Sequence, residues 1–172
     1  MRPSKVYKGQ DRQPFTRRKY IKKGVDKKLM KMVMGDSAKQ DFPIHVKLIA
    51  QESINISEHS LESVRTNINR RLLAEVGKGE PEHYRFEVVP YPHHYARAHG
   101  LVGVMKGERF CKGMRLSFGK VERRMARVKK GQVIFIISLE DKNHIQVARE
   151  LLRIARCKLP KISQKYRVEI DQ

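Results

Sequence analysis

The segment RFCKGMRLSFGK, residues 109–120, combines two glycines with several basic residues, as loops that grip phosphate do. A nucleotide-hydrolysing loop places four residues between its last two glycines and follows the second one with Lys and then Ser or Thr. Here five residues separate Gly113 from Gly119, and Val121 follows Lys120. Because valine supplies no hydroxyl for magnesium, the spacing argues against a nucleotide hydrolase. The segment is better explained as a loop that holds a nucleic acid.

Histidines raise the question of a metal site, since His93, His94 and His99 precede Cys111 in a glycine-containing segment. Adjacent residues on an extended strand point to opposite sides, so His93 and His94 do not readily share one ion. The sequence has no CxxC or HxxxH pair there to anchor a tetrahedral site. We therefore predict no metal, and we expect the two adjacent histidines to contact RNA phosphates or bases.

Catalytic groups are hard to find in this chain. Cys111 lies among Arg109, Lys112 and Arg115, a setting that can favour a reactive thiolate, but a small residue in a basic loop explains the same pattern. Acidic residues are scarce where the basic ones concentrate, and helical ones such as Glu62 fit a solvated face. The sequence predicts neither a catalytic residue nor a cofactor.

Positive charge is concentrated in two stretches of this 172-residue, one-domain-sized chain, whose formal net charge is +20. Residues 1–31 hold twelve Lys or Arg against two acidic residues, and residues 97–130 hold eleven against two. The rest is nearly balanced, with fifteen basic and fourteen acidic side chains. Such concentrated like charge repels itself unless an anion neutralises it, so we predict a polyanionic partner.

Membrane insertion and secretion are not expected. The uncharged run GQVIFIISL at 131–139 is far shorter than the ~20 residues of a spanning helix. Charges begin at Arg2, without the apolar stretch of a secretory signal. Two cysteines are too few for a disulfide framework, which fits a reducing cytoplasm.

Alternating apolar residues predict the strands. They occur in FPIHVKLIA (42–50), SINIS (53–57), residues 84–88 and YRVEI (166–170). RRMARVKKGQVIFIISL (123–139) predicts two more strands around a turn at Lys130 and Gly131, the second being strongly apolar and central.

Two helices are predicted from the 3.6-residue period. The first begins near Ser57 as N-cap, ends at Gly77 and carries one apolar stripe, formed by Leu61, Val64, Ile68, Leu72 and Val76. The second begins at Asp141 or Asn143 and ends before Pro160. On the first helix, Arg65, Arg70 and Arg71 lie off the stripe, and whether they meet phosphate or only water stays open.

These elements predict an α+β fold, a two-layer sandwich of one mostly antiparallel sheet with two packed helices. Residues 1–31 are expected to form a basic extended arm, and residues 32–172 a single globular domain. Within the domain, residues 96–112 lack apolar periodicity and contain three glycines, so we expect a long, flexible, basic loop.

Six ordered blocks resemble one known family. They are DRQPFTRRKYIKK (11–23), FPIHVKL (42–48), YPHH (91–94), GMRLSFGK (113–120), ARVKKGQVIFII (126–137) and ARCKLP (155–160). In this order and at these intervals they are similar to the archaeal and eukaryotic form of the universal large-subunit ribosomal protein sixteen, the ten-e family. The chain stops soon after YRVEI, which favours the archaeal type.

The resemblance implies an α+β fold and a cytoplasmic, ribosomal location beside 23S and 5S rRNA and neighbouring large-subunit proteins. It also implies that the loop from Ala96 to Lys112 points toward the tRNA-binding cleft near the peptidyl transferase centre. This chain departs from the family pattern at GERF (107–110), where relatives usually have ADR, and at VERR (121–124), where they tend to show Pro, Gly and Thr.

Charge, glycine placement and resemblance together predict the residues that bind RNA. Among these residues, the glycines let the backbone approach rRNA, and the basic side chains meet phosphates. They are Arg12, Arg17, Arg18, Lys19, Lys22, Lys23, His93, His94, Arg97, Lys106, Arg109, Gly113, Arg115, Gly119, Lys120, Arg123, Arg124 and Arg127.

Two alternatives remain beside a structural component of the large subunit. One is a free-standing RNA-binding or RNA-chaperone module, which the composition permits equally. The other is a metal-dependent nuclease that uses His93, His94 and Cys111.

Overall fold

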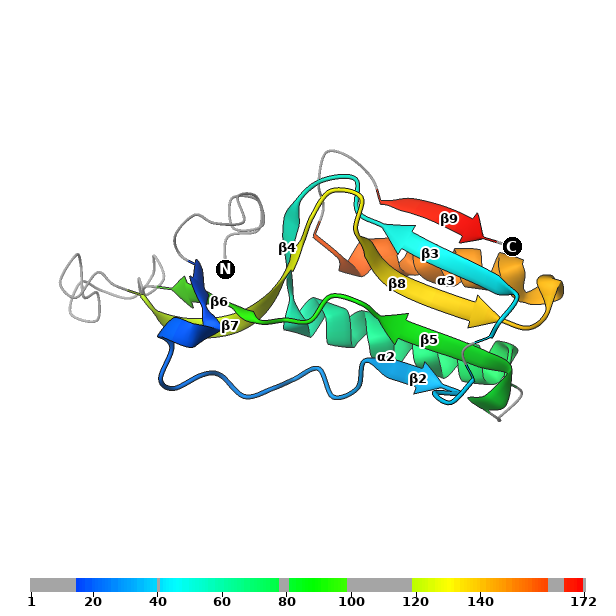
Figure 1. Cartoon of the computed structure of the whole chain (residues 1–172), viewed down its shortest axis with the longest axis horizontal. Helices are drawn as coiled ribbons and strands as arrows, with labels where there is room; N and C mark the ends of the chain where they lie inside the picture. The colour runs from blue at the N-terminus through cyan, green and yellow to red at the C-terminus, as the bar shows by residue number, and fades with distance from the viewer. Residues whose placement is uncertain (1–14, 40, 78–80, 99–118, 161–165, 172) are drawn as a thin grey trace, which may run out of the picture.

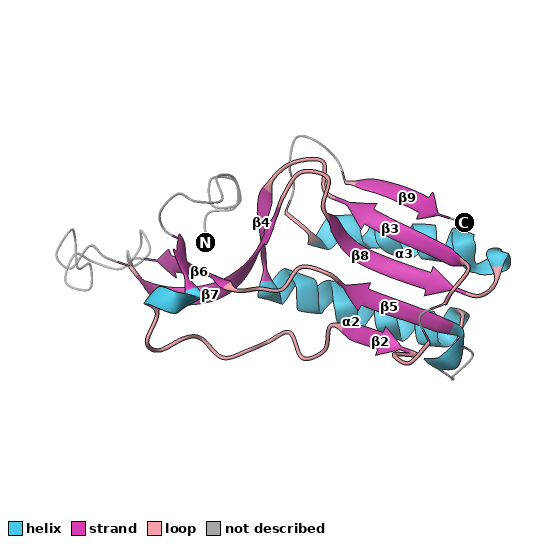
Figure 2. Ribbon diagram, in the orientation of Figure 1, coloured by secondary structure: helices cyan, strands magenta, loops and turns pink. Residues whose placement is uncertain are grey.

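Two antiparallel sheets and two α-helices make up the part of the chain that the computed structural model describes, residues 15–39, 41–77, 81–98, 119–160 and 166–171 (Figures 1 and 2). The predicted α+β class is confirmed. The strands expected in one sheet are divided between two, because the connections β3–β4, β5–β6 and β7–β8 each pass from one sheet to the other.

The larger sheet has the strand order β2-β5-β8-β3-β9. These strands are β2 Val33–Gly35, β5 Tyr84–Val88, β8 Val133–Leu139, β3 Ile44–Ile49 and β9 Arg167–Asp171. The apolar strand β8 is central, as predicted. Helices α2 (Glu58–Glu75) and α3 (Ile145–Lys158) cover one face of this sheet, and the main core lies between the two layers (Figure 2).

Helix α2 begins and ends where its sequence signals predict. The hydroxyl of Ser57 accepts a hydrogen bond of 3.2 Å from the Ser60 backbone N–H, which satisfies one of the free donors at the helix start. The predicted stripe from Leu61 to Leu72 is buried against the sheet. Helix α3 follows a short 3₁₀ turn, Lys142–His144, and ends just before Pro160.

The smaller sheet has the order β1-β6-β7-β4, formed by β1 Phe15–Arg17, β6 His94–Ala98, β7 Lys120–Val128 and β4 Ile54–Ser57. Strands β1, β2 and β6 were not predicted. The expected loop start is therefore wrong: Ala96 is fully buried and pairs with Arg123, so residues 96–98 belong to β6. Residues 99–112 of that loop lie outside the described residues.

A shared bend joins the two sheets. The connection between β7 and β8 turns at Gly131, whose backbone has a φ of +80°. Its N–H donates to the Ala50 carbonyl at 2.8 Å, and the Ala50 N–H donates to the Gln132 carbonyl at 3.0 Å. These bonds tie the turn to the link between β3 and β4, so both chain segments cross from one sheet to the other together (Figure 1).

Two glycines offer a matched test of the backbone. Gly35 and Gly131 share a φ of +80°, but a Cβ at Gly35 would lie 2.1 Å from the Tyr84 carbonyl oxygen, whereas one at Gly131 meets nothing within 4 Å. We expect Gly131→Ala to lower the free energy of unfolding by about 1–2 kcal/mol, the cost of the left-handed conformation. Gly35→Ala should cost clearly more. Urea unfolding of both variants measures this, and equal losses would contradict the steric argument.

Candidate nucleic-acid interface

A basic segment, residues 21–31, which we call the strap, runs from the small sheet to β2 along the body (Figure 1). It follows β1 and the 3₁₀ turn Arg18–Tyr20. Five of its side chains are exposed lysines: Lys22, Lys23, Lys27, Lys28 and Lys31. The strap therefore places a row of positive charges on the surface, as an interface with a phosphate backbone requires.

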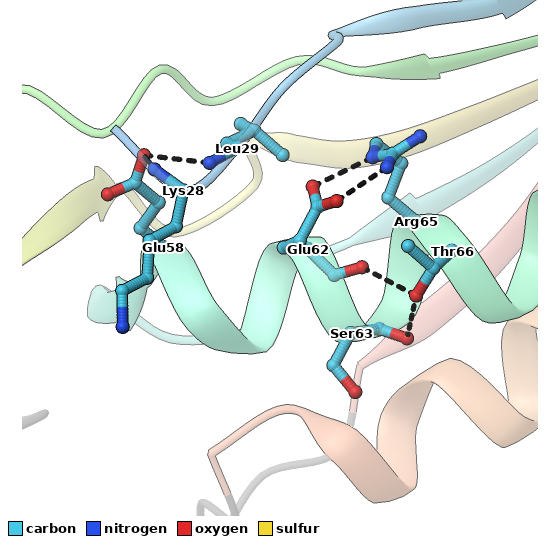
Figure 3. A network of polar contacts seen from close by, with 7 residues as sticks. All are labelled: Lys28, Leu29, Glu58, Glu62, Ser63, Arg65 and Thr66. Carbon is cyan, nitrogen blue, oxygen red and sulfur yellow. Dashed lines mark hydrogen bonds and ion pairs between the residues drawn. The ribbon is translucent and has the colours of Figure 1, made fainter. Parts of the chain in front are cut away.

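Glu58 holds the strap in place through the strap's backbone. One oxygen of its carboxylate accepts hydrogen bonds from the N–H groups of Lys28 at 2.8 Å and Leu29 at 2.9 Å (Figure 3). The Glu58 side chain sits in the first turn of α2, where the helix dipole favours a negative charge, and the residue is only 3% exposed. Backbone bonding leaves the ammonium group of Lys28 out of this contact.

Other contacts also hold the strap near the Glu58 hydrogen bonds. Leu29 is 0% exposed and joins the main core. The Arg124 guanidinium donates to the Val25 carbonyl at 2.9 Å and lies 5.8 Å from the centre of the Tyr95 ring. Residues 15–31 of the predicted basic extended arm are tied to the body, because β1 pairs with β6 and Leu29 enters the core. Residues 1–14 lie outside the described part.

A pocket of about 340 Å³ lies between the strap, the start of α2 and β7. Its lining brings Asp26, Glu58 and Glu122 together with three basic residues, Lys28, Arg123 and Arg124. Arg123 and Glu122 form an ion pair with an N–O distance of 3.3 Å. Because the charges balance, the pocket does not favour phosphate, and its polar groups serve to hold the strap.

Strands β6 and β7 carry several of the predicted RNA-binding residues. Lys120 and Arg123 are exposed, as are Lys22 and Lys23 in the strap and Lys19 in the 3₁₀ turn before it. Arg97 donates to the Gly119 carbonyl at 3.1 Å, and the side chains of Arg97, Arg124 and Arg127 are half-buried. Arg124 also donates to the Val25 carbonyl of the strap, a structural contact that the sequence did not indicate.

His94 does not reach the surface. It is 3% exposed in β6, where it pairs with Arg17 of β1 and Met125 of β7, whereas His93 is exposed. The expected opposite orientation of the two histidines is confirmed. The expected RNA contact of His94 is wrong, because its ring is covered by the body.

Several predicted residues cannot be placed further. Arg17 lies in β1 and Arg18 opens the 3₁₀ turn, but only their backbone is described. Outside the described residues lie Arg12, Lys106, Arg109, Gly113 and Arg115. Their contacts with RNA remain predictions.

The helix arginines divide into two groups. Arg65 binds both carboxylate oxygens of Glu62 one turn away, with Nε 2.8 Å from one of them (Figure 3). The hydrogen bond from Arg65 lowers the pKa of Glu62 and raises that of Arg65. Arg65 is therefore engaged on its own helix, while Arg70 and Arg71 are exposed.

Two observations bear on metal binding and membranes. Within the described ranges, no three His, Cys, Asp or Glu side chains lie close enough together to hold a metal ion. Cys111 of the nuclease alternative falls outside those ranges. None of the helices described is long and apolar enough to cross a membrane.

An α+β body with a row of strap lysines and a basic strand pair defines a basic nucleic-acid-binding protein. The sequence model of the family "Ribosomal protein L16p/L10e" matches residues 10–165. The chain belongs to this family, as the resemblance predicted.

Curated relatives carry the name "Large ribosomal subunit protein uL16". One from Methanococcus maripaludis (strain C7) is 36% identical over 160 residues, covering 93% of this chain and 90% of the relative. Relatives from Thermofilum pendens and Thermoplasma acidophilum are each 33% identical and cover 93% and 92% of this chain, and 92% and 88% of their own lengths. All three organisms are archaeal, in line with the predicted type.

The two hydrogen bonds from the strap backbone to Glu58 give a direct prediction. Glu58→Ala leaves two backbone N–H groups without their charged acceptor, so we expect a loss of about 2–4 kcal/mol in the free energy of unfolding. The Leu29 amide should also exchange its hydrogen much faster than in the unmodified protein. Glu58→Gln keeps an oxygen in reach of both donors and should restore most of the protection. Unchanged Leu29 exchange in Glu58→Ala would show that the strap is held without the carboxylate.

Proposed function

We propose that this protein is a structural component of the large ribosomal subunit that binds ribosomal RNA. The observation that carries this proposal is the family match over residues 10–165, with relatives named as large-subunit proteins along nearly the whole chain. The family is a structural one, and this function needs no catalytic residue.

The surface chemistry supports RNA as the partner. The strap lysines are exposed and the strap backbone is fixed, so the charges reach a phosphate backbone without unfolding any core. Each neutralised phosphate releases counterions, which makes such binding strong at low salt and strongly salt-dependent. A free-standing RNA chaperone would share this chemistry, but the family match favours the ribosomal role.

Finer partners follow from the family resemblance. We propose that the strap and the β6–β7 pair contact 23S rRNA, that 5S rRNA and neighbouring large-subunit proteins lie nearby, and that the loop after β6 faces tRNA. The register supports this placement, because Ala98 pairs with Lys120 and so brings the two flanking positions together. The loop's two ends thus enter and leave the body side by side.

Co-sedimentation tests the ribosomal assignment. We expect the protein to sediment with large subunits at about one copy each and to remain bound after a wash in moderately high salt. A protein that stays in the supernatant would contradict the proposal and would support a free RNA-binding module.

Charge variants test the strap as the RNA surface. Replacing Lys22 and Lys23 by Ala should lower the log–log salt slope of rRNA binding by up to about 1.8, since each phosphate contact contributes about 0.9. The control removes the same charge from α2, with Arg70→Ala and Arg71→Ala. Equal effects of both pairs would show that net charge, and not the strap, sets the slope. Deleting residues 1–31 is a poorer test because it removes the buried Leu29 and β1.

The loop after β6 gives a test of the tRNA proposal. Replacing residues 99–118 by a short Gly-containing turn should leave β6 and β7 paired, since their ends are already neighbours. We expect melting of the isolated protein to change little and the shortened protein to enter large subunits. Those subunits should bind tRNA more weakly than subunits with the full chain. Normal tRNA binding would remove the loop from the proposed function.

A further inference from the structure

The connection between β5 and β6 presents a stripe of uncharged side chains to solvent. Along residues 89–93 exposure alternates: Val89 is 36% exposed, Tyr91 is 52% exposed and His93 is exposed, while Pro90 and Pro92 are buried. Tyr91 is one of four large hydrophobic side chains exposed within the described residues. With Val89 it forms a small apolar surface whose aromatic ring offers a flat face to a partner.

This stripe is rigid. At one end the Val89 N–H donates to the Ile134 carbonyl of β8 at 3.1 Å, and at the other His94 enters β6. Between these anchors the two prolines fix their φ angles near −65°, and the His93 ring Nδ1 lies 3.2 Å from the Tyr91 carbonyl oxygen, within hydrogen-bonding distance. The Tyr91 ring therefore projects from a backbone held on both sides, which lowers the entropy cost of binding.

Positive charge lies at the β6 end of the stripe. Two residues beyond His93, Tyr95 is 1% exposed, with its hydroxyl 2.8 Å from where a Cβ on Gly24 of the strap would lie. Lys22 and Lys23, both exposed, immediately precede Gly24. The stripe thus runs from open apolar and aromatic groups toward the basic strap.

We propose that Val89, Tyr91 and His93 bind unpaired nucleotides of RNA, with one base stacked on the Tyr91 ring and the neighbouring phosphates at Lys22 and Lys23. Aromatic rings beside a basic track are the common means of binding single-stranded RNA, because every base has a face to stack. This inference rests on the proposed RNA-binding function and specifies that the stripe recognises unpaired bases, which duplex RNA does not offer.

A protein partner fits the stripe less well. The stripe is a single row of three side chains on one extended segment, far smaller than the roughly 800 Å² per partner of a stable protein interface. Glu87 precedes the stripe, but the charged residue that follows it is Arg97, and Lys22 and Lys23 of the strap lie toward the same end, so positive charge complements a nucleic acid there.

Binding of labelled RNA to the full-length protein tests the inference. The probe is a single-stranded RNA of about 12 nucleotides, within the footprint of common single-strand binders, compared with a duplex of equal length. We expect Tyr91→Ala to weaken binding of the single strand by about tenfold, within the range measured for one stacked base. Duplex affinity and the salt slope should not change, because no charge is removed.

Two further variants separate stacking from plain apolar contact. Tyr91→Phe keeps the ring and should bind the single strand nearly as the unmodified protein does. Tyr91→Leu keeps apolar bulk without a π-face and should bind as weakly as Tyr91→Ala. Full affinity in Tyr91→Ala or Tyr91→Leu, or equal losses for single strand and duplex, would overturn the inference. If the protein co-sediments with large subunits but gives these binding results, only the inference about the stripe is overturned. Failure to sediment would overturn the proposed function itself.

Discussion

The hydrogen bonds from the strap backbone to Glu58 set the arrangement on which the charged surface depends. A chain with a net charge of +20 must hold a lysine-rich segment against its body without neutralising that segment. A carboxylate that accepts from backbone N–H groups achieves this, because the anchoring energy comes from peptide groups while the lysine side chains stay in solvent. Had the strap been fixed by ion pairs to its lysines, each pair would compete with a phosphate. The buried Leu29 side chain also anchors the strap, since its apolar burial stabilises the attachment without using any charge.

Regular local patterns allowed much of the body to be predicted from sequence. Strands β3, β5 and β8 show alternation or a long apolar run, and both helices show the 3.6-residue period with a recognisable start and stop. Strands β1 and β2 have three residues each, too few for a period, and β6 reads HYARA with only small or amphipathic side chains. Pairing with other strands defines them, β1 with β6, β2 with β5 and β6 with β7, and pairing partners distant in sequence leave no local signal.

The sequence predicted the exposed charges of the candidate site but not the side chains that hold the strap in place. Exposed lysines are found by counting, because burying an unpaired ammonium is costly and Asp26 is the one acidic residue within the strap sequence. Glu58, in contrast, looks like any acidic residue in a first helical turn, and its partners lie 29 and 30 positions away. Arg124 was expected at phosphate for its charge, yet its guanidinium also holds the Val25 carbonyl. His94 shows the same limit, since alternation predicts that one of two adjacent histidines turns inward but not which one.

The division into two sheets separates stability from recognition. On the uncovered face of the large sheet, charges compensate one another: Arg85 lies 3.7 Å from Glu87, and Lys47 pairs with Asp171. That face offers little net attraction to an anion, and the helices on the other face bury the main core. The exposed lysines of the candidate site lie on the small sheet, at the end of the molecule away from α3, and on the strap that leads from it along the body (Figure 1). Attraction by exposed charge is long-ranged and largely indifferent to sequence, so a charged surface alone would bind any duplex. A fixed strap and a rigid proline-flanked segment add what charge cannot supply: positions that are set before binding, so that only RNA of matching shape gains every contact at once.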